Sequence, residues 1–344
     1  MIVIMEATSL VRDQLNVTNT VSVVISTYAI ERHDLVSKCI ASLRAQTLPA
    51  HEIILVLEPD KKLLLHYQGE DTKDVKIVIS GERGLSSARN AGVATSHGAI
   101  IAFIDDDAIA EEEWLENLMR DFDDPTVIGV GGAIIPMWEE TRPKWFPEEL
   151  DWTVGCTYKG LPLVKAVVKN PLGCNMAFRR SAFERAGQFD TRVGRLGQVL
   201  LASEEAEFAR RLLSLTPKSR ILHDPSLVVH HRVPKSRTTL SHVLLRSFYE
   251  GVSKSILQRN SSFKTPLSVE RNYLRDLLVI SIPQRLRRIS HLTSILQLSS
   301  ILLSTLAVFA GYCYGYCIRT GLSEAPIDEN HFSSKAESIL EAVV

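Results

Sequence analysis

Short apolar runs alternate with segments of helical spacing along the first third of the chain. The runs are rich in β-branched side chains, as in VSVVIST at 21–27, which is typical of strands buried on both faces. Between them, apolar residues recur three and four positions apart, which predicts helices. This alternation predicts an α/β fold with a largely parallel sheet. The predicted strands are 21–27, 52–57, 76–79 and 99–104, and the predicted helices are 35–45, 86–96 and 111–122.

The pattern is less regular between residues 128 and 231. The aromatic stretch 144–158 follows neither period, so we expect a loop or a lid there. A helix over 202–213 has Ser203 as its expected cap, with acids in its first turn and arginines later, as the helix dipole favours. Another helix is expected to begin at Ser181 and to stop at Gly187. The remaining predicted strands are 128–136, 175–178 and 227–231.

Beyond residue 238 the chain has the character of a membrane-associated protein. The segment 273–288 is apolar on one side and basic on the other, which suits a membrane surface. No charged residue occurs in 292–318, which is longer than the roughly 20 residues that cross a bilayer. The alternatives for this run are an interfacial or re-entrant helix and a buried core helix. Arginines precede the run and acids outnumber bases after it, so the positive-inside rule places the large domain in the cytoplasm.

Composition narrows the function classes. The 344 residues carry a net charge of -1, so nothing indicates binding to nucleic acid. The five cysteines form no CxxC pair and are read as reduced thiols, not as a disulfide framework or a zinc site. The N-terminal segment 1–20 is expected to be a lead-in without the features of a signal peptide.

Polar residues follow three of the predicted strands. Ligands of parallel sheets bind beyond the carboxyl ends of the strands. Thr27 and Tyr28 end the first strand and Glu58 follows the second, with Asp60 close behind. The fourth strand ends in three adjacent aspartates, 105–107, whose like charges favour a bound hard divalent cation. The alternative is a solvated acidic turn.

Five motifs occur in order over residues 20–235 and resemble the family 2 glycosyltransferases. They are VSVVISTY, GLSSARNAG, FIDDDA, GCNMAFRR and SEEAEFARRL. This resemblance implies the GT-A fold, a Rossmann-like mixed sheet that binds nucleotide-diphospho-sugars. The pattern after residue 272, YLRDLLVISIPQRLRR followed by an apolar run with GYCYGY, is similar to archaeal enzymes that add hexuronic acid to dolichyl-phosphate-linked glucose during protein N-glycosylation.

The resemblance implies a role for each candidate residue at the donor site. Asp105 and Asp107 would hold Mn²⁺ or Mg²⁺, which stabilises the charge of the leaving diphosphate. Asp106 would contact ribose or support the geometry. The other residues expected beside the nucleotide-sugar are Thr27, Tyr28, Glu58, Arg89 and Asn90. Glu58 departs from the family pattern because Pro59 follows it, and Arg89 and Asn90 are alternatively an ordinary surface arginine and a helical asparagine.

Sugar transfer also needs a base for the acceptor hydroxyl. The family supplies it from an acidic pair at a helix start, which here is Glu204 and Glu205. Glu205 is the expected base and Glu204 the second choice; helix capping is the alternative role for both. Direct attack in line would invert the anomeric carbon.

The acceptor side of the site is less well defined. Asn175, Trp152 and Arg237 are the candidates for contact with the acceptor or the sugar, although aromatic residues in loops often only pack. His231 is expected in the metal shell. Neighbouring strand residues point opposite ways, so His230 and His231 would not both serve, and the sequence does not choose between them.

The sequence as a whole predicts a membrane-associated, metal-dependent, inverting glycosyltransferase that faces the cytoplasm. Its expected donor is UDP-glucuronate and its expected acceptor is dolichyl-phosphate glucose. The alternatives are a transferase for surface polysaccharide or glycolipid that uses UDP-glucose, a non-catalytic nucleotide-binding scaffold, and a soluble nucleotidyltransferase. The expected organisation is a lead-in at 1–20, a catalytic domain at 21–237, a membrane-surface region at 238–291, an apolar helix at 292–318 and a polar tail at 319–344.

Overall fold

The fold is known from a computed structural model that describes residues 20–68, 74–192, 203–260 and 268–317. Most of the lead-in and the whole polar tail therefore lie outside the described residues. The chain divides into two compact units. The first comprises the residues up to Ile134 together with Val164–Phe189 and Phe208–His230, and the second comprises Ile135–Leu163, Asp190–Glu207 and the residues from His231 onward.

A mixed sheet forms the centre of the first unit, and its described strands run in the order β3-β2-β1-β4-β8-β6-β9-β5, with β7 paired to β9. The first four strands pair in parallel, as the sequence predicts, whereas β8 lies antiparallel to β4 and to β6. The strands are β1 (Val21–Thr27), β2 (Glu52–Leu57), β3 (Val75–Ile79), β4 (Ile100–Asp105), β5 (Ala108–Ala110), β6 (Val127–Trp138), β7 (Ala166–Val168), β8 (Asn175–Arg179) and β9 (Arg220–Val233).

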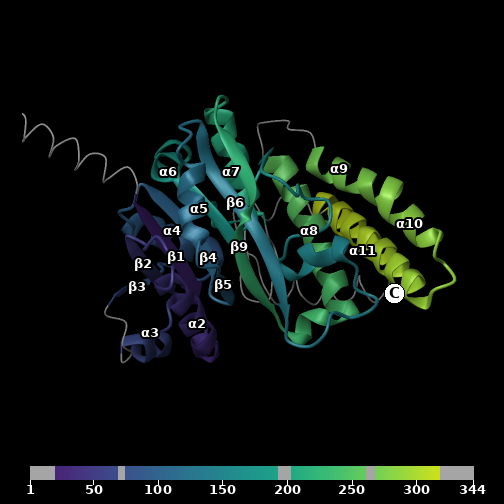
Figure 1. Ribbon diagram of the computed structural model, residues 1–344, viewed down its shortest axis with the longest axis horizontal. Coiled ribbons are helices and arrows are strands. Elements are labelled where there is room, and N and C mark those ends of the chain that lie inside the picture. Colours follow the sequence, from purple (N-terminus) through teal and green to yellow (C-terminus); the bar gives the residue numbers. More distant parts are fainter. Residues whose placement is uncertain (1–19, 69–73, 193–202, 261–267, 318–344) are drawn as a thin grey trace, which may run out of the picture. The chain divides into compact units, whose positions relative to one another are not determined.

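Helices lie against the strands of this unit (Figure 1). The apolar side chains of the strands are largely buried. The helix α4 packs against β1, β2 and β3. Five phenylalanine rings pack against one another in the core around β4 and β8, mostly edge to face, namely Phe103, Phe178, Phe183, Phe189 and Phe208. The α-helices that precede β9 in the sequence are α2 (His33–Arg44), α3 (Lys61–Gln68), α4 (Leu85–Thr95), α5 (Trp114–Asp121), α6 (Arg180–Ala186) and α7 (Glu204–Leu215).

The second unit is largely helical. The predicted lid contains a 3-10 helix, η2 (Glu148–Val154), instead of an irregular loop. The long helices α8 and α11 lie side by side (Figure 1). The C-terminal elements are η3 (Lys235–Thr238), α8 (Leu240–Asn260), α9 (Ser268–Asp276), the π-helical turn η4 (Leu277–Ser281), α10 (Ile282–Leu286) and α11 (Leu292–Cys317).

One described helix, α11, is long and apolar enough to cross a membrane. Its most apolar window has a mean hydropathy of 1.8, and 22% of that window is buried in the protein. A core helix of a soluble protein would be mostly buried, so this exposure favours contact with lipid. Length and composition agree with the apolar run predicted at 292–318, of which Ile318 lies outside the described residues.

Candidate active site

The carboxyl ends of β1, β2 and β4 meet at one edge of the sheet. In the register of the parallel strands, Thr27 lies opposite Leu57, and Ser26 lies opposite Asp105. The amide of Glu58 donates to the carbonyl oxygen of Thr27 at 3.1 Å. The polar residues that follow the three strands therefore share one edge, as the sequence predicts.

Two of the three aspartates bind an arginine. Arg32 ends the turn η1 (Ile30–Arg32), and its Nε lies 2.6 Å from Oδ2 of Asp106. Its Nη2 lies 2.5 Å from Oδ1 of Asp106 and 2.8 Å from Oδ2 of Asp107. Both carboxylates are buried, whereas the side chain of Asp105 is 33% exposed. Of the three, Asp105 is thus the carboxylate with access to a ligand.

Arg89 connects Asp105 to the loop before β8. Its buried guanidinium donates to the carbonyl oxygen of Gly173 at 2.9 Å and lies 3.4 Å from Oδ1 of Asp105. A carboxylate oxygen of Asp105 also lies within 4.8 Å of the Sγ of Cys174. Arg89 is therefore not a surface arginine, and its charge is placed beside the exposed aspartate.

The buried charges shift one another's ionisation. Burial raises the pKa of Asp106 above its ordinary value, although the hydrogen bonds and charge of Arg32 oppose this. Burial alone would lower the pKa of Arg32, but its bonds to Asp106 and the charge of Asp107 raise it, so the arginine stays protonated. Burial and the nearby aspartates also raise the pKa of Cys39. Two arginines, Arg32 and Arg89, thus offset most of the negative charge of the three aspartates at this edge.

The acidic side chains that follow β2 accept hydrogen bonds from backbone amides of this chain. Glu58 accepts a hydrogen bond from the amide of Gly84 at 2.9 Å and so holds the start of α4. Asp60 accepts from the amides of Lys62 and Leu63, as an N-cap does. Tyr28, which follows β1, differs because the residue is 59% exposed. An exposed ring at this edge suits stacking on a nucleobase.

The two candidate asparagines are engaged with backbone. Asn90 donates to and accepts from the backbone of Phe189, both at 2.9 Å. Asn175 donates to the carbonyl oxygens of Ala133 and Leu227 and accepts from the indole of Trp114. These bonds give both asparagines a structural task, so their proposed ligand contacts rest on the sequence resemblance.

The acidic pair begins α7 in the second unit. Glu204 is buried, and Glu205 is half-buried beside it. The preceding residue, Ser203, has φ 92, a left-handed conformation that non-glycine residues rarely adopt. Strained backbone of this kind clusters at functional sites. A role for the pair in catalysis is therefore taken up below as a proposal.

The two histidines of β9 have different surroundings. His230 is paired with Glu111 at 3.0 Å and is partly exposed. His231 is buried, and its Nδ1 lies 3.7 Å from the Sγ of Cys156. The alternation of strand side chains thus separates them as expected, and the buried His231 is the better candidate for a ligand role.

Trp152 and Arg237 lie in different settings within the second unit. The indole of Trp152 donates to the hydroxyl of Tyr273 at 3.2 Å, and Arg246 lies over its ring. Arg237 forms no ion pair among the described residues, whereas Arg232 and Lys235 are neutralised by glutamates. Of these three neighbouring cations, Arg237 is therefore the one without an ionic partner in the described part of the chain.

Sequence reasoning missed Arg32 and Cys174 at this edge. Arg32 is 74 positions from Asp106, and no local pattern links the two. Cys174 stands inside the recognised GCNMAFRR motif, so its position next to the strand that pairs with β4 was the available signal.

Comparison with known proteins decides the family. The model of the glycosyl transferase family 2 matches residues 22–187, which contain the sheet edge just described. A glucosyl-dolichyl phosphate glucuronosyltransferase of Haloferax volcanii is 33% identical over 303 residues, which cover 86% of this chain and 96% of that protein. The chain belongs to glycosyltransferase family 2. The family and the archaeal resemblance expected from the motifs are both confirmed.

Other family 2 relatives are more distant. A succinoglycan biosynthesis protein of Rhizobium meliloti is 25% identical, over 69% of this chain and 74% of that protein. A pre-mycofactocin glycosyltransferase of Mycobacterium tuberculosis is 26% identical, over 61% of this chain and 43% of that protein. Because the chain belongs to family 2, the protein is a glycosyltransferase, and its mixed sheet is the sheet of the family 2 fold.

Proposed function

We propose that this family 2 enzyme transfers glucuronate from UDP-glucuronate to dolichyl-phosphate glucose at the cytoplasmic face of a membrane, as a step of protein N-glycosylation. The observation that carries the proposal is the match to nearly the whole length of the Haloferax volcanii glucuronosyltransferase. The apolar, exposed α11 supports it, because a lipid-linked acceptor lies in the membrane.

The donor would bind at the edge formed by β1, β2 and β4. Thr27, Tyr28 and Glu58 follow the strands there, and Arg89 adds a cation for the diphosphate. The diphosphate of the donor is anionic, so it would bind at this acidic edge together with a cation. The exposed face of Tyr28 would stack on the base.

A divalent metal fits the donor atoms at this edge. Family 2 enzymes often use one. Hard cations take carboxylate oxygens, and Asp105 presents a partly exposed carboxylate. Asp107 would join it by exchanging Arg32 for the metal, and His231 is the candidate from the second unit. The bound Mn²⁺ or Mg²⁺ would supply positive charge for the leaving diphosphate.

The acceptor hydroxyl needs a proton acceptor. Glu205 at the start of α7 is the proposed base, with Glu204 beside it. The hydroxyl oxygen then attacks the anomeric carbon in line with the departing diphosphate and inverts it. Positioned bases contribute about 10²–10⁴-fold to rate, so Glu205→Gln is expected to lower transfer by that order.

The test is a transfer assay in detergent with dolichyl-phosphate glucose and a panel of UDP-sugars, with and without Mn²⁺. Product should form from UDP-glucuronate, and Glu205→Gln should lower its rate of formation about 10²–10⁴-fold while UDP still raises the melting temperature. Glu207→Gln, on the same helix, is the matched control and should stay active. Loss of nucleotide binding in Glu205→Gln would instead indicate a structural role.

A second function has one observation in its favour. The similarity to the succinoglycan biosynthesis protein covers 69% of the chain, which supports a role in polysaccharide synthesis. UDP-glucose is the donor proposed for this second function. In the same assay this function predicts transfer from UDP-glucose and none from UDP-glucuronate. If no nucleotide raises the melting temperature, a scaffold role replaces both.

A further inference from the structure

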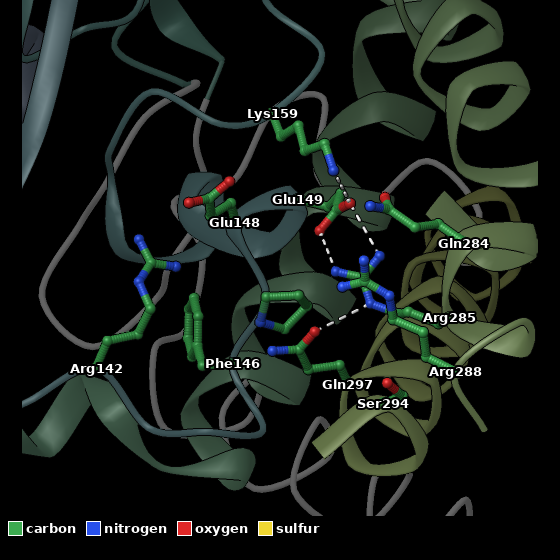
Figure 2. A pocket seen from close by; sticks show the side chains of 11 residues that line it. Arg142, Phe146, Glu148, Glu149, Lys159, Gln284, Arg285, Arg288, Ser294 and Gln297 are labelled. Atoms are coloured by element: carbon green, nitrogen blue, oxygen red, sulfur yellow. Dashed lines mark hydrogen bonds and ion pairs between the residues drawn. The ribbon is translucent and has the colours of Figure 1, made fainter. Parts of the chain in front are cut away.

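A polar cavity opens between the predicted lid and the C-terminal helices of the second unit. Its volume is about 270 Å³, slightly below the range of sites that enclose a whole drug-sized ligand. Four cationic side chains line it, and Figure 2 shows them around η2 and α10. They are Arg142, Lys159, Arg285 and Arg288.

Acids compensate three of these cations. Glu149 accepts from both terminal nitrogens of Arg285, at 3.0 and 2.7 Å, and lies 3.2 Å from Lys159. Asp151 pairs with both terminal nitrogens of Arg142. Burial alone would raise the pKa of Glu149, but the bonds from Arg285 and its neighbours lower it to about 2. These ion pairs fix the cationic wall in place.

Arg288 is the exception. It is exposed, and among the described residues no acid lies within ion-pair distance of its guanidinium. Four cationic and two acidic side chains line the cavity, and Asp151 pairs with one of the cations, so the group carries a net charge of +1. Ser294 and Gln297 add neutral polar groups on α11. This combination of fixed and uncompensated cations is complementary to an anion with several oxygen atoms.

Exposed apolar side chains lie on α10, on α11 and in the turn between them, close in sequence to residues that line the cavity. Leu286, Ile289, Leu292 and Ile295 are each more than 40% exposed, and they alternate along the chain with the cavity residues Arg285, Arg288 and Ser294. A soluble anion would gain nothing from such a border. An amphiphile would place its anionic head in the cavity and its apolar chain along α10 and α11.

We propose that this cavity binds the phosphate of a membrane lipid, with Arg288 as the contacting cation and the exposed apolar residues of α10 and α11 along the lipid chain. The inference rests on the proposed function only in placing these helices at a membrane. It adds a lipid-phosphate site in the second unit to the nucleotide site at the sheet edge.

The chain offers a matched pair of variants. Arg287 and Arg288 are neighbours, both are exposed, and only Arg288 lines the cavity. Arg287→Gln and Arg288→Gln each remove one charge, so general attraction to an anionic surface falls equally in both. Neither change leaves a buried acid without its partner, so both variants should fold, and a shift in melting temperature with UDP checks this.

The experiment measures binding of the full chain to nanodiscs at high ionic strength, where screening weakens general surface attraction. The nanodiscs contain phosphatidylcholine alone, phosphatidylcholine with an isoprenoid phosphate, or phosphatidylcholine with phosphatidylglycerol. Arg288→Gln should bind the isoprenoid-phosphate discs about fivefold more weakly than Arg287→Gln does. Inorganic phosphate is the soluble probe: it is added to the protein with the neutral discs, and the melting temperature is measured.

Each outcome either supports or overturns the lipid-phosphate site. A selective loss with isoprenoid phosphate supports the site and identifies it with the acceptor's lipid, and an equal selective loss with phosphatidylglycerol supports a site for any lipid phosphate. Equal behaviour of the two variants overturns the proposal. Stabilisation by inorganic phosphate that Arg288→Gln removes, without any loss of lipid binding, also overturns it. If UDP binding is retained, any of these results tests the lipid-phosphate site alone and leaves the proposed transferase function unaffected.

Discussion

Arg32 holds two of the three carboxylates that follow β4 at hydrogen-bond distance. The buried Asp106 and Asp107 would repel each other without it. Removing one partner of a buried ion pair leaves an uncompensated charge and costs far more than an exposed pair is worth. The arginine therefore serves as the internal counter-ion of the acidic cluster, in the position that a metal would share.

Arg32→Met should destabilise the protein and increase its response to metal. The free energy of unfolding should fall by about 3–5 kcal/mol, because two buried carboxylates lose their partner. Mn²⁺ should restore part of the loss by binding the freed carboxylates, so the rise in melting temperature with Mn²⁺ should exceed that of the unaltered protein. Differential scanning fluorimetry with and without Mn²⁺ measures both effects.

The control for this change is Arg44→Met. Arg44 pairs with Asp74, but both side chains are about half exposed. Such surface pairs are worth about 0–1 kcal/mol. If both variants lose equally little stability and respond equally to Mn²⁺, Arg32 is not the counter-ion of a metal-binding cluster.

Asp121 permits a test of pH dependence away from the site. Burial and the nearby Asp224 raise its pKa from 3.8 to about 6, against the hydrogen bond from Lys165. Between about pH 4 and pH 6 the folded protein therefore holds a proton that the unfolded chain releases, so this group's contribution to stability falls as pH rises. Asp121→Asn should reduce the fall in melting temperature over that range.

Asp123→Asn is the control, because Asp123 is the exposed neighbour on the same turn. Its pH profile of melting temperature should match that of the unaltered protein. A profile of Asp121→Asn that is parallel to both would show that Asp121 is not protonated more readily in the folded state.

Local pattern predicted the acidic end of the site but not its partners. The aspartates were recognisable because a buried apolar run ends in them. Arg32 lies 74 positions away, and in the sequence nothing distinguishes it from other arginines. The amide contacts of Asn90 and Asn175 are likewise made to backbone across β-strands and turns distant in sequence. Tertiary pairing, which has no period, determines these contacts.

Among the elements, α8 and α11 pack at very short range through small residues. A Cβ on Gly251 would lie 2.0 Å from the carbonyl oxygen of Val308, and one on Gly311 would lie 1.9 Å from that of Phe248. The hydroxyls of Ser247 and Ser304 are 2.8 Å apart across the same interface. Small residues spaced four apart and interhelical hydroxyl bonds are features of helix pairs in membranes.

Gly311→Ala should therefore separate the two helices. The added methyl group meets backbone, which cannot rotate away, so the loss of stability should reach about 1–3 kcal/mol. Thermal unfolding in detergent measures it. Gly81→Ala is the control, because a Cβ there meets nothing within 4 Å. An equal melting temperature for the two variants would contradict the close packing of α8 and α11.

Element types and boundaries were predictable where one period dominates, but the extent of a strand was not where turn-forming residues interrupt the pattern. The strands β1 to β4 agree with the predicted runs within one residue at each end. The strand β9 covers Arg220–Val233, although only 227–231 was predicted. Asp224, Pro225 and Ser226 look like a turn, but Lys165 pairs with Asp224 at 2.8 Å, and Ser226 donates to it. Side-chain partners thus allow turn-forming residues inside a strand.

For the molecule as a whole, the relationship to the archaeal enzyme extends beyond the catalytic motifs. The family model ends at residue 187. A match over 86% of the chain necessarily includes α8, α9 and α10. The sequence similarity to a protein named for a lipid-linked acceptor therefore extends over the segments that form α8, α9 and α10.

The last prediction concerns α11 as a membrane helix. Its 26 residues span about 39 Å, more than the roughly 30 Å of a bilayer core. Leu306 is 54% exposed on it. In lipid, Leu306→Arg should cost about 2.5–3.5 kcal/mol of insertion, whereas on a water-exposed surface it would cost almost nothing. We therefore expect the unaltered chain to stay with membranes through salt and alkaline washes, and Leu306→Arg to be partly released. Leu65→Arg, at an exposed leucine of α3, is the matched control and should remain bound. An unaltered chain that remains in the supernatant without detergent would contradict the membrane assignment and favour a soluble enzyme.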